Sequence, residues 1–314
     1  MKIETKRHPT KFYLTLGLGS LFFIAIGSVL IFVGIDNKIK DDTKSNHFIL
    51  AVFGSIFCLL AIWMVYKYLK NAPKVIINKS FLRIGNEKFR LDNIKDVILT
   101  GKMPFPFIIN FPMEGSAIVF KDGREIFLFD DMYANSYEVK SFLEQVVVNK
   151  QEFKLRILNK IKKNVLRFEK KQVFKGNQFI TLRGISLWWI LGLFILVLIN
   201  RRLTNAGIIF FSVFGPLWFI LHSWLMHYFV ITKNFLVIRN HNFTWKERIY
   251  SISDIREVVF ESRGNQPNCL KVITIDFKSK LYPASTLSDR TWLDMKKKLE
   301  TKGIEVRNEC IYEE

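Results

Sequence analysis

Four long apolar runs, grouped in two closely spaced pairs, constrain the fold of this chain more than any other feature of its sequence. They cover residues 12–35, 48–66, 185–199 and 206–229. About 20 apolar residues in a helix cross the hydrocarbon core of a bilayer. The third run is shorter, but Arg183, Arg201 and Arg202 flank it, and such long basic side chains extend the usable length of a span. The runs therefore predict two transmembrane hairpins, one within residues 1–70 and one within residues 184–228.

The lysines and arginines predict how these hairpins are oriented. They gather before the first run and after the second, at Lys2, Lys6, Arg7, Lys11, Lys67, Lys70, Lys74 and Lys79. Because segments rich in these residues stay in the cytoplasm, both chain ends are expected there, in a multi-pass protein of the cytoplasmic (inner) membrane. The first run is too long for the apolar core of a secretory signal, and no small-x-small cleavage pattern follows it. We therefore expect an anchor.

The strong positive charge of the chain points to an anionic partner. The net charge is +19, which suits nucleic acid or the anionic inner face of a membrane. The apolar runs favour anionic lipids, and no recognised nucleic-acid motif accompanies the basic residues. Cys58, Cys269 and Cys310 are scattered without CxxC or Cys/His spacing. We therefore expect neither a disulfide framework nor a metal site, and no cofactor.

Similar stretches of sequence follow the two hairpins and indicate an internal repeat. The aligned blocks are VIINKSFLRI with FVITKNFLVI, at residues 75–84 and 229–238, and residues 91–97 with residues 252–258. The second copy has seven extra residues between its blocks, as expected for a loop insertion. The copies are expected to share one fold, with Phe81 and Phe235 at equivalent, buried positions.

The repeated stretches carry the alternation and turns that are typical of β-strands. Residues 117–129 form two short runs around Asp122 and Gly123, a strong hairpin signal, and residues 272–277 are their counterpart. A closing helix follows in each copy, capped by Asn135 in the first and by Ser288 in the second. Apolar faces at helical spacing are expected at Val139, Phe142, Leu143 and Val146, and at Trp292, Met295 and Leu299.

A transmembrane hairpin followed by short antiparallel strands and one closing helix resembles the bacterial PH-like membrane proteins, which carry one pleckstrin-homology-like domain after the hairpin. This chain looks like a tandem of two such units. The resemblance implies an α+β fold with two PH-like β-barrels, at residues 71–149 and 229–314, each closed by its C-terminal helix. It also implies no established enzymatic activity, together with membrane association and oligomer formation.

A basic linker, residues 150–183, separates the two units. Residues 150–175 hold ten lysines and arginines, and an apolar stripe at helical spacing runs through Phe153, Ile157, Ile161, Val165 and Phe168. These features predict an amphipathic helix. It lies either on the anionic leaflet, apolar side down, or in solvent with its stripe packed on a neighbouring domain.

Basic residues in the first copy and in the linker are candidates for binding anionic lipid. PH domains that bind inositol phosphates often carry Lys-x(n)-Lys/Arg-x-Arg, and Lys79 with Lys88 and Arg90 fits that pattern. Lys233 with Lys246 and Arg248 fits it in the second copy. A solvated basic face is the alternative interpretation. The complete candidate set is Lys79, Lys88, Arg90, Lys160, Lys162, Lys163 and Arg167.

His222 is an ionisable residue inside the fourth apolar run, about seven residues from its inner end. An ionisable group at such a depth is a candidate for a proton or ligand role. No carboxylate accompanies it in the run, so the alternative is a neutral histidine that hydrogen-bonds to a neighbouring span.

Residues 103–113 form an apolar segment with three prolines that the second copy lacks. Proline cannot donate a hydrogen bond to a sheet, so a regular central strand is excluded. A loop that enters the membrane interface, a lip that binds another protein and a plain connection at the edge of a sheet all remain open.

The sequence favours a protein that is not an enzyme. Paired catalytic carboxylates, a nucleophile elbow, a phosphate loop and a metal-ligand cluster are all missing. We expect a membrane scaffold or adaptor whose PH-like domains bind a partner protein, each other as a homo-oligomer, or anionic lipid. The alternative is a small transporter or an enzyme-like membrane protein that uses His222.

Overall fold

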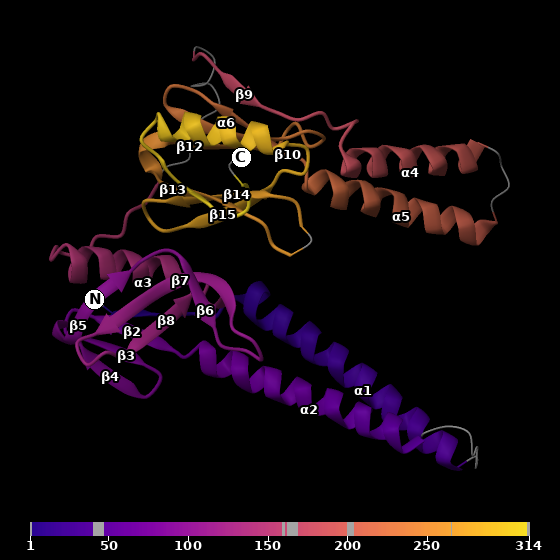
Figure 1. The fold of residues 1–314 in the computed structure, drawn as a ribbon, viewed down its shortest axis with the longest axis horizontal. Coiled ribbons are helices and arrows are strands. Elements are labelled where there is room, and N and C mark those ends of the chain that lie inside the picture. Colours follow the sequence, from indigo (N-terminus) through magenta and orange to yellow (C-terminus); the bar gives the residue numbers. More distant parts are fainter. Residues whose placement is uncertain are drawn as a thin grey trace. The chain divides into compact units, whose positions relative to one another are not determined.

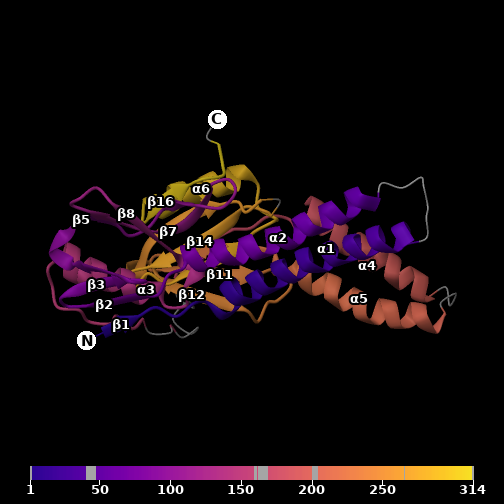
Figure 2. The ribbon, with the colours of Figure 1, turned by 90° about the horizontal axis from the view of Figure 1, so that it is seen from below.

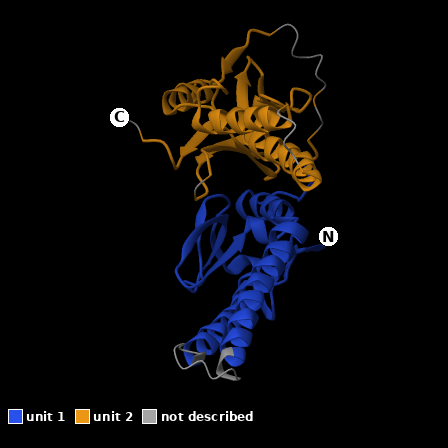
Figure 3. Ribbon diagram, turned by 90° about the vertical axis from the view of Figure 1, so that its right-hand side faces the viewer, with its two compact units in different colours: residues 1–156 blue, residues 157–314 orange. Residues whose placement is uncertain are grey.

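The computed structural model describes residues 2–39, 47–158, 161, 169–199, 204–264 and 266–312. The chain divides into two compact units, residues 1–156 and 157–314 (Figure 3). Each unit joins one pair of long helices to two β-sheets and a short closing helix (Figure 1). The described residues therefore have the predicted α+β composition.

Four helices among the described residues are long and apolar enough to cross a membrane. They are α1 (Thr15–Ile39), α2 (His47–Asn71), α4 (Leu182–Ile199) and α5 (Asn205–Trp224), and a π-helix (Pro9–Leu14) precedes α1. The helices lie side by side in pairs, α1 with α2 and α4 with α5 (Figures 1 and 2). Only 11% of each apolar window is buried inside the protein. Such exposed apolar surface is consistent with a multi-pass membrane protein.

The backbones of the first helical pair approach one another closely where each has a glycine. A Cβ atom added at Gly54 would lie 2.6 Å from the Gly27 carbonyl oxygen, and one added at Gly27 would lie 2.7 Å from the Gly54 carbonyl oxygen. Small residues at a helix crossing permit such a backbone approach. The two glycines therefore fix how α1 packs on α2.

The fourth helix ends earlier than the apolar run that predicts it. The run continues to residue 229, whereas α5 stops at Trp224 and a strand, β10 (His227–Ile231), follows. Two of the last apolar residues of the run, Met226 and Phe229, are fully buried within the second unit. A strand buried on both faces is as apolar as the end of a span, so hydropathy alone does not separate the two.

The first unit contains two sheets of antiparallel strands. One has the order β1-β2-β3-β4, and the other has the order β5-β7-β6 with β8 paired to β7. The strands are β1 (Lys2–Glu4), β2 (Val75–Asn78), β3 (Phe81–Ile84), β4 (Glu87–Arg90), β5 (Ile94–Ile98), β6 (Lys102–Phe105), β7 (Phe111–Phe120) and β8 (Glu125–Phe129). The predicted hairpin around Gly123 is confirmed as β7 and β8, and Gly123 has a φ of +84°. Positive φ suits glycine in such a turn.

The second unit also contains two sheets. Their orders are β12-β11-β10-β9 and β15-β14-β13-β16, with β16 parallel to β13. Besides β10, the strands are β9 (Gln172–Phe174), β11 (Phe235–Asn240), β12 (Glu247–Ser251), β13 (Ile255–Glu261), β14 (Cys269–Thr274), β15 (Ser279–Pro283) and β16 (Glu305–Asn308). Strand pairing does not join the two sheets in the described part of either unit, so no closed barrel is formed.

A short helix covers the core of each unit. In the first unit it is α3 (Ser136–Phe142), which continues as a π-helix (Leu143–Val148), and in the second it is α6 (Asp289–Glu300). The predicted apolar faces are confirmed. Val139, Phe142 and Leu143 are buried, Val146 packs against the same cluster, and Trp292, Met295 and Leu299 are fully buried.

Each unit begins with a strand that precedes its helical pair along the chain. β1 pairs with β2 across the first pair of helices, and β9 pairs with β10 across the second. The sequence predicted neither strand, and the domain boundaries at residues 71 and 229 exclude both. Each helical pair is therefore inserted between two neighbouring strands of one sheet. The pairing of those strands fixes the positions where the chain enters and leaves the helical pair.

The linker is not helical where the structure describes it. Residues 151–158 have no regular secondary structure, and Gln172–Phe174 form a strand. Residues 159–160 and 162–168 lie outside the described residues. The Gln145 side chain accepts a hydrogen bond from the Lys154 amide at 2.7 Å and donates to the Lys154 carbonyl at 3.1 Å. These bonds occupy backbone groups that a helix would need, so the predicted helix is wrong at this end.

The aligned blocks pair in the same register in both units. Val75 lies opposite Ile84 as Phe229 lies opposite Ile238. Phe81 and Phe235 begin equivalent strands, but both are only half-buried, whereas Leu82 and Leu236 are fully buried. The expectation of buried phenylalanines is therefore wrong by one residue. Neighbouring residues of a strand face opposite sides of a sheet, and here the leucines face the core.

Candidate functional site

Polar side chains tie the end of α5 to the second domain. Asn240 donates a hydrogen bond to the Ser223 carbonyl oxygen at 2.7 Å, and Asn242 donates to the Ser223 hydroxyl at 2.7 Å. Met226 forms a β-bridge with Ala284, just beyond β15. The turn between β11 and β12, residues 241–246, therefore lies against the end of a helix that is long enough to cross a membrane.

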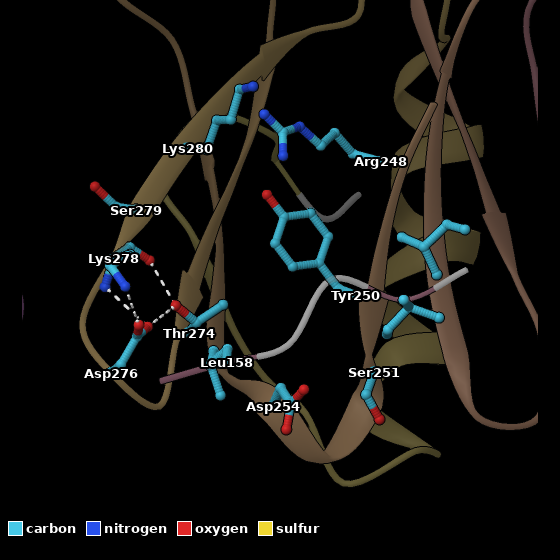
Figure 4. A pocket seen from close by; sticks show the side chains of 12 residues that line it. Leu158, Arg248, Tyr250, Ser251, Asp254, Thr274, Asp276, Lys278, Ser279 and Lys280 are labelled. Atoms are coloured by element: carbon cyan, nitrogen blue, oxygen red, sulfur yellow. Dashed lines mark hydrogen bonds and ion pairs between the residues drawn. The ribbon is translucent and has the colours of Figure 1, made fainter. Parts of the chain in front are cut away.

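A groove opens beside this junction. It has a volume of about 390 Å³ and lies between β12 and β15, the edge strands of the two sheets in this unit (Figure 4). No strand among the described residues joins these two edges, and the groove lies in the gap between the two sheets at this side.

Two cations, Arg248 and Lys280, line one end of the groove, and Lys246 lies close enough to Lys280 for its charge to act on it. The Lys246 ammonium lies 4.9 Å from the ring centre of Trp224, the last residue of α5. Arg248 lies on β12 and Lys280 lies on β15, and their side chains extend toward one another (Figure 4). We call Lys246, Arg248 and Lys280 the basic cluster. The edge strands of two different sheets thus place Arg248 and Lys280 close together, and Lys246 connects the cluster to the end of α5.

The electrostatics of the basic cluster favour an anion. Within the part of the chain that the structure describes, no carboxylate forms an ion pair with its three members. Burial, and then the positive charges of Arg248 and Lys246, lower the pKa of Lys280. A bound anion would offset this repulsion and would restore the affinity of Lys280 for its proton.

The acidic residues that line the groove lie away from the basic cluster, and the neighbouring Glu247 is paired with Arg239. Asp254 and Asp276 line the opposite end of the groove, where the Lys278 ammonium is 2.7 Å from Asp276 (Figure 4). Between the two ends stands Tyr250, whose hydroxyl is 2.6 Å from that of Tyr282. Burial raises the pKa of both phenols. They therefore stay protonated and add hydrogen-bonding capacity, without negative charge, beside the cations.

The linker contributes an apolar wall to the same groove. Leu158 and Ile161 line it, and both side chains are half-buried. In the first unit, Phe153 packs on Phe142 with ring centres 5.4 Å apart. Two members of the predicted apolar stripe, Phe153 and Ile161, thus pack on protein. This packing favours the interpretation in which the linker lies on neighbouring domains over one in which it lies on lipid.

The predicted candidates in the first copy are arranged differently. Lys79 lies 3.4 Å from Glu152, and Arg90 lies 3.4 Å from Asp92, while the Lys88 ammonium stacks 4.2 Å from the Phe81 ring centre. All three basic side chains are exposed, and carboxylates neutralise two of them. Lys160, Lys162, Lys163 and Arg167 lie outside the described residues.

The second copy separates the members of its own pattern. Lys246 and Arg248 belong to the basic cluster, but Lys233 lies at the turn between β10 and β11, where its carbonyl accepts a bond from Lys302. The third member, Lys280, comes from a strand that follows much later in the chain. No local spacing could have identified it, because the juxtaposition depends on the approach of two sheet edges.

His222 lies two residues before the end of α5 rather than deep within a span. Its ring packs against that of Trp218 with centres 4.1 Å apart and planes tilted by 36°, and its Nδ1 atom is buried without a hydrogen-bond partner. Its imidazole is also within hydrogen-bonding reach of the Arg183 backbone near the start of α4. This position at the helix end differs from the predicted depth because α5 gives way to β10 so early.

The described residues contain no group of three or more histidine, cysteine or acidic side chains that could hold a metal ion. Burial raises the pKa of Cys269 and of Cys310 to about 11, so both remain thiols near neutral pH. No protein-family model and no curated protein matches the chain.

Proposed function

We propose that this protein is a non-enzymatic, multi-pass protein of the cytoplasmic membrane, and that its second PH-like domain binds the head groups of anionic lipids. The observation that carries the proposal is the basic cluster: Arg248 and Lys280 line one end of the groove beside Lys246, and no carboxylate among the described residues forms an ion pair with any of the three. Lipid binding would make the domain a membrane-tethered scaffold whose interaction with the leaflet depends on lipid charge.

The PH-like assignment is part of the proposal and is supported by the architecture. Both units place a four-stranded antiparallel sheet beside a second sheet, with a closing helix over the shared core. The equal register of the aligned blocks supports the idea that the units are copies of one ancestral module. The distribution of lysines and arginines supports a cytoplasmic location for both domains.

The position of the basic cluster supports lipid as the source of the anion. Tryptophan is enriched where a span meets the head groups, and Lys246 stacks on Trp224 at the end of α5. The cluster is thereby held at head-group level. Each basic residue near an anionic leaflet contributes about 1 kcal/mol, and the attraction decays within about 8 Å at physiological salt. Cations this close to the leaflet therefore retain most of that attraction.

Lipid binding can be measured on the full chain. We would purify it in a mild detergent and count bound phosphatidylglycerol and phosphatidylcholine by native mass spectrometry. The native chain is expected to retain phosphatidylglycerol preferentially, and the double variant R248Q/K280Q to lose most of that preference. Free glycerol phosphate, added as a competitor, distinguishes recognition of the head group alone from recognition of the whole lipid.

A matched control removes the same charge elsewhere on the domain. Lys233 and Lys297 are exposed and lie outside the groove, so K233Q/K297Q should bind phosphatidylglycerol like the native chain. Equal losses in the two double variants would mean that net charge alone attracts the lipid, and would overturn the proposed site. Unchanged binding by R248Q/K280Q would overturn it as well.

A further inference from the structure

An apolar β-hairpin projects from the first domain, and its tip is the least protected apolar surface of that domain. β6 and β7 pair from Lys102 with Glu114 to Phe105 with Phe111, and residues 106–110 form the tip. The tip contains no charged residue. Ile108 is 68% exposed and Ile109 is 79% exposed. Two adjacent, largely exposed isoleucines are energetically unfavourable in water, so they indicate a surface that is buried against a partner or the membrane.

The tip lies against the end of α2. The Asn71 side chain donates a hydrogen bond to the Pro106 carbonyl oxygen at 2.8 Å. The Phe107 ring centre is 4.9 Å from that of Trp63 and 6.2 Å from that of Tyr68. Trp63 precedes Asn71 by eight residues, which is about 12 Å along a helix. The hairpin therefore follows the last two turns of α2, and it reaches toward the helical pair in Figure 1.

These turns lie where a span meets the head groups. The candidate span in α2, Phe48–Asn71, has 24 residues, or about 36 Å of helix, against a hydrocarbon core of about 30 Å, so its last turns with Lys67 and Lys70 extend beyond the core. Lys67 stacks on Trp63 at 5.4 Å, and Lys70 on Tyr66 at 6.0 Å. Aromatic rings with lysines folded over them are typical of the interface. A hairpin tip held at the level of Trp63 is therefore at the depth of the interface.

The hairpin is held rigidly at this depth. Phe105 is fully buried, with its ring centre 4.8 Å from that of Phe111 and 5.0 Å from that of Phe129. The same apolar cluster contains Phe12, from the turn that leads into α1. Because this cluster joins the hairpin base to the helical pair, the tip cannot move away from α2 without exposing the cluster.

Two prolines argue that the partner of the tip is lipid rather than a protein strand. Pro104 and Pro112 lie opposite one another on β6 and β7. At this end of β7, residues 111–114 pair only with β6, so both strands are sheet edges there. Proline has no N–H group to offer an added strand and protects a sheet edge against pairing.

We propose that the β6–β7 hairpin inserts its tip, with Ile108 and Ile109, into the bilayer in which α1 and α2 lie. It acts as a third membrane contact of the first unit and fixes the height and tilt of that domain over the leaflet. The second copy lacks this segment. There the turn between β11 and β12 lies beside its own helix and exposes Trp245, which is 68% accessible. The two domains therefore have different membrane contacts.

Depth-dependent fluorescence quenching tests the insertion. A bimane label would be placed at I109C in a full-length chain whose three native cysteines are alanine, reconstituted into nanodiscs. Lipids with a nitroxide near the head group should quench this label several-fold more than iodide does. Ile98 provides the matched control because it is an exposed isoleucine of the same domain, on β5. A label at I98C should respond to iodide and not to the nitroxide lipid.

Equal iodide quenching at the two positions would overturn the proposal, as would a label at I109C that neither quencher reaches. Photo-crosslinking provides a second route that leaves the cysteines in place. A benzophenone amino acid at residue 109 should form adducts with lipid, and adducts with protein only would also overturn insertion. Neutral and anionic nanodiscs should give the same result, because the tip is uncharged. A loss of anionic-lipid preference at the groove and a lack of insertion by the hairpin tip are therefore separate, distinguishable outcomes.

Discussion

Arg7 donates two hydrogen bonds to the carbonyl oxygen of Ala72, at 3.1 and 3.0 Å. Arg7 lies before the first helical pair, and Ala72 lies just after it, so this contact joins the two chain segments at the base of the helical pair. Tyr133 adds a hydrogen bond from its hydroxyl to the Pro73 carbonyl. Together these bonds connect the segments that lead into and out of the first helical pair, at the point where the helices meet the domain.

Replacing Arg7 with glutamine should loosen this base. The change removes a charged donor from a carbonyl group, and hydrogen bonds to charged groups contribute about 1.5–3 kcal/mol. We expect a lower thermal midpoint of the purified chain and faster hydrogen exchange in residues 2–7 and 72–75. Arg90 is the control because its pair with Asp92 is highly exposed, and R90Q should leave both measurements near their native values.

In the first unit, a buried ion pair connects α3 to Asp130, which directly follows β8. The Lys140 ammonium is 2.8 Å from Asp130 Oδ2, and the lysine side chain is 2% exposed. Removing one partner of a buried pair leaves an uncompensated charge and costs about 3–5 kcal/mol. K140M should therefore destabilise the domain strongly in thermal unfolding, and K140M/D130N should recover part of the loss. A double variant no more stable than K140M would show that the packing of Lys140, rather than its charge, is what matters.

Local patterns in the sequence predicted a large part of the fold. The apolar runs located all four long helices, since about 20 consecutive apolar residues are a strong local signal. The spacing of Trp292, Met295 and Leu299 predicted the buried face of α6 for the same reason. A glycine at positive φ is required by the turn at Gly123 and marks the hairpin by itself.

Long-range pairing set the limits of prediction. β1 and β9 have three residues each, too few for a periodic signal, and their partner strands follow after an entire helical pair. The adjacent acids Asp130 and Asp131 each form an ion pair with a lysine from elsewhere in the chain, Lys140 and Lys11, which no local spacing predicts. Asn135 has the residue type of a helix cap, but its side chain instead bonds to the backbone of Lys6 and Glu4, beside β1. The basic cluster was likewise not predictable from local sequence, because Lys280 lies near Arg248 only once the two sheets pack together.

The glycine contact between α1 and α2 should be essential for the first helical pair. Gly54→Val would place side-chain atoms into the backbone of α1, where a single Cβ already comes within 2.6 Å of an oxygen atom. We expect G54V to lower the thermal midpoint in detergent and to increase proteolysis of the loop between α1 and α2. Gly17 has no atom within 4 Å of an added Cβ, so G17V should be tolerated. Similar losses in the two variants would show that helix propensity, and not the crossing, is responsible.

His241 should make the stability of the second domain depend on pH. Burial, and then the charges of Lys175 and His227, lower its pKa from 6.5 to about 4. Its Nε2 atom is 3.1 Å from the Thr286 hydroxyl, beside the junction with α5. In the unfolded chain this histidine binds a proton at a higher pH than in the folded chain. Between pH 6.5 and pH 4 the unfolded state therefore holds more protons, and the free energy of unfolding falls as the pH falls.

The contribution of His241 is fully present above pH 6.5 and is lost progressively as the pH approaches 4. The native chain should therefore show a lower thermal midpoint at pH 4.5 than at pH 7.5. H241Q keeps a side chain that can hydrogen-bond to Thr286 but does not titrate, so the difference between the two midpoints should shrink. His8 is the control, since it lies in the first unit and burial also lowers its pKa, and H8Q should leave the pH dependence of the second domain unchanged. An H241Q chain with the native pH dependence would assign the effect to other groups, and the proximity of His227 makes H227Q the next variant to measure.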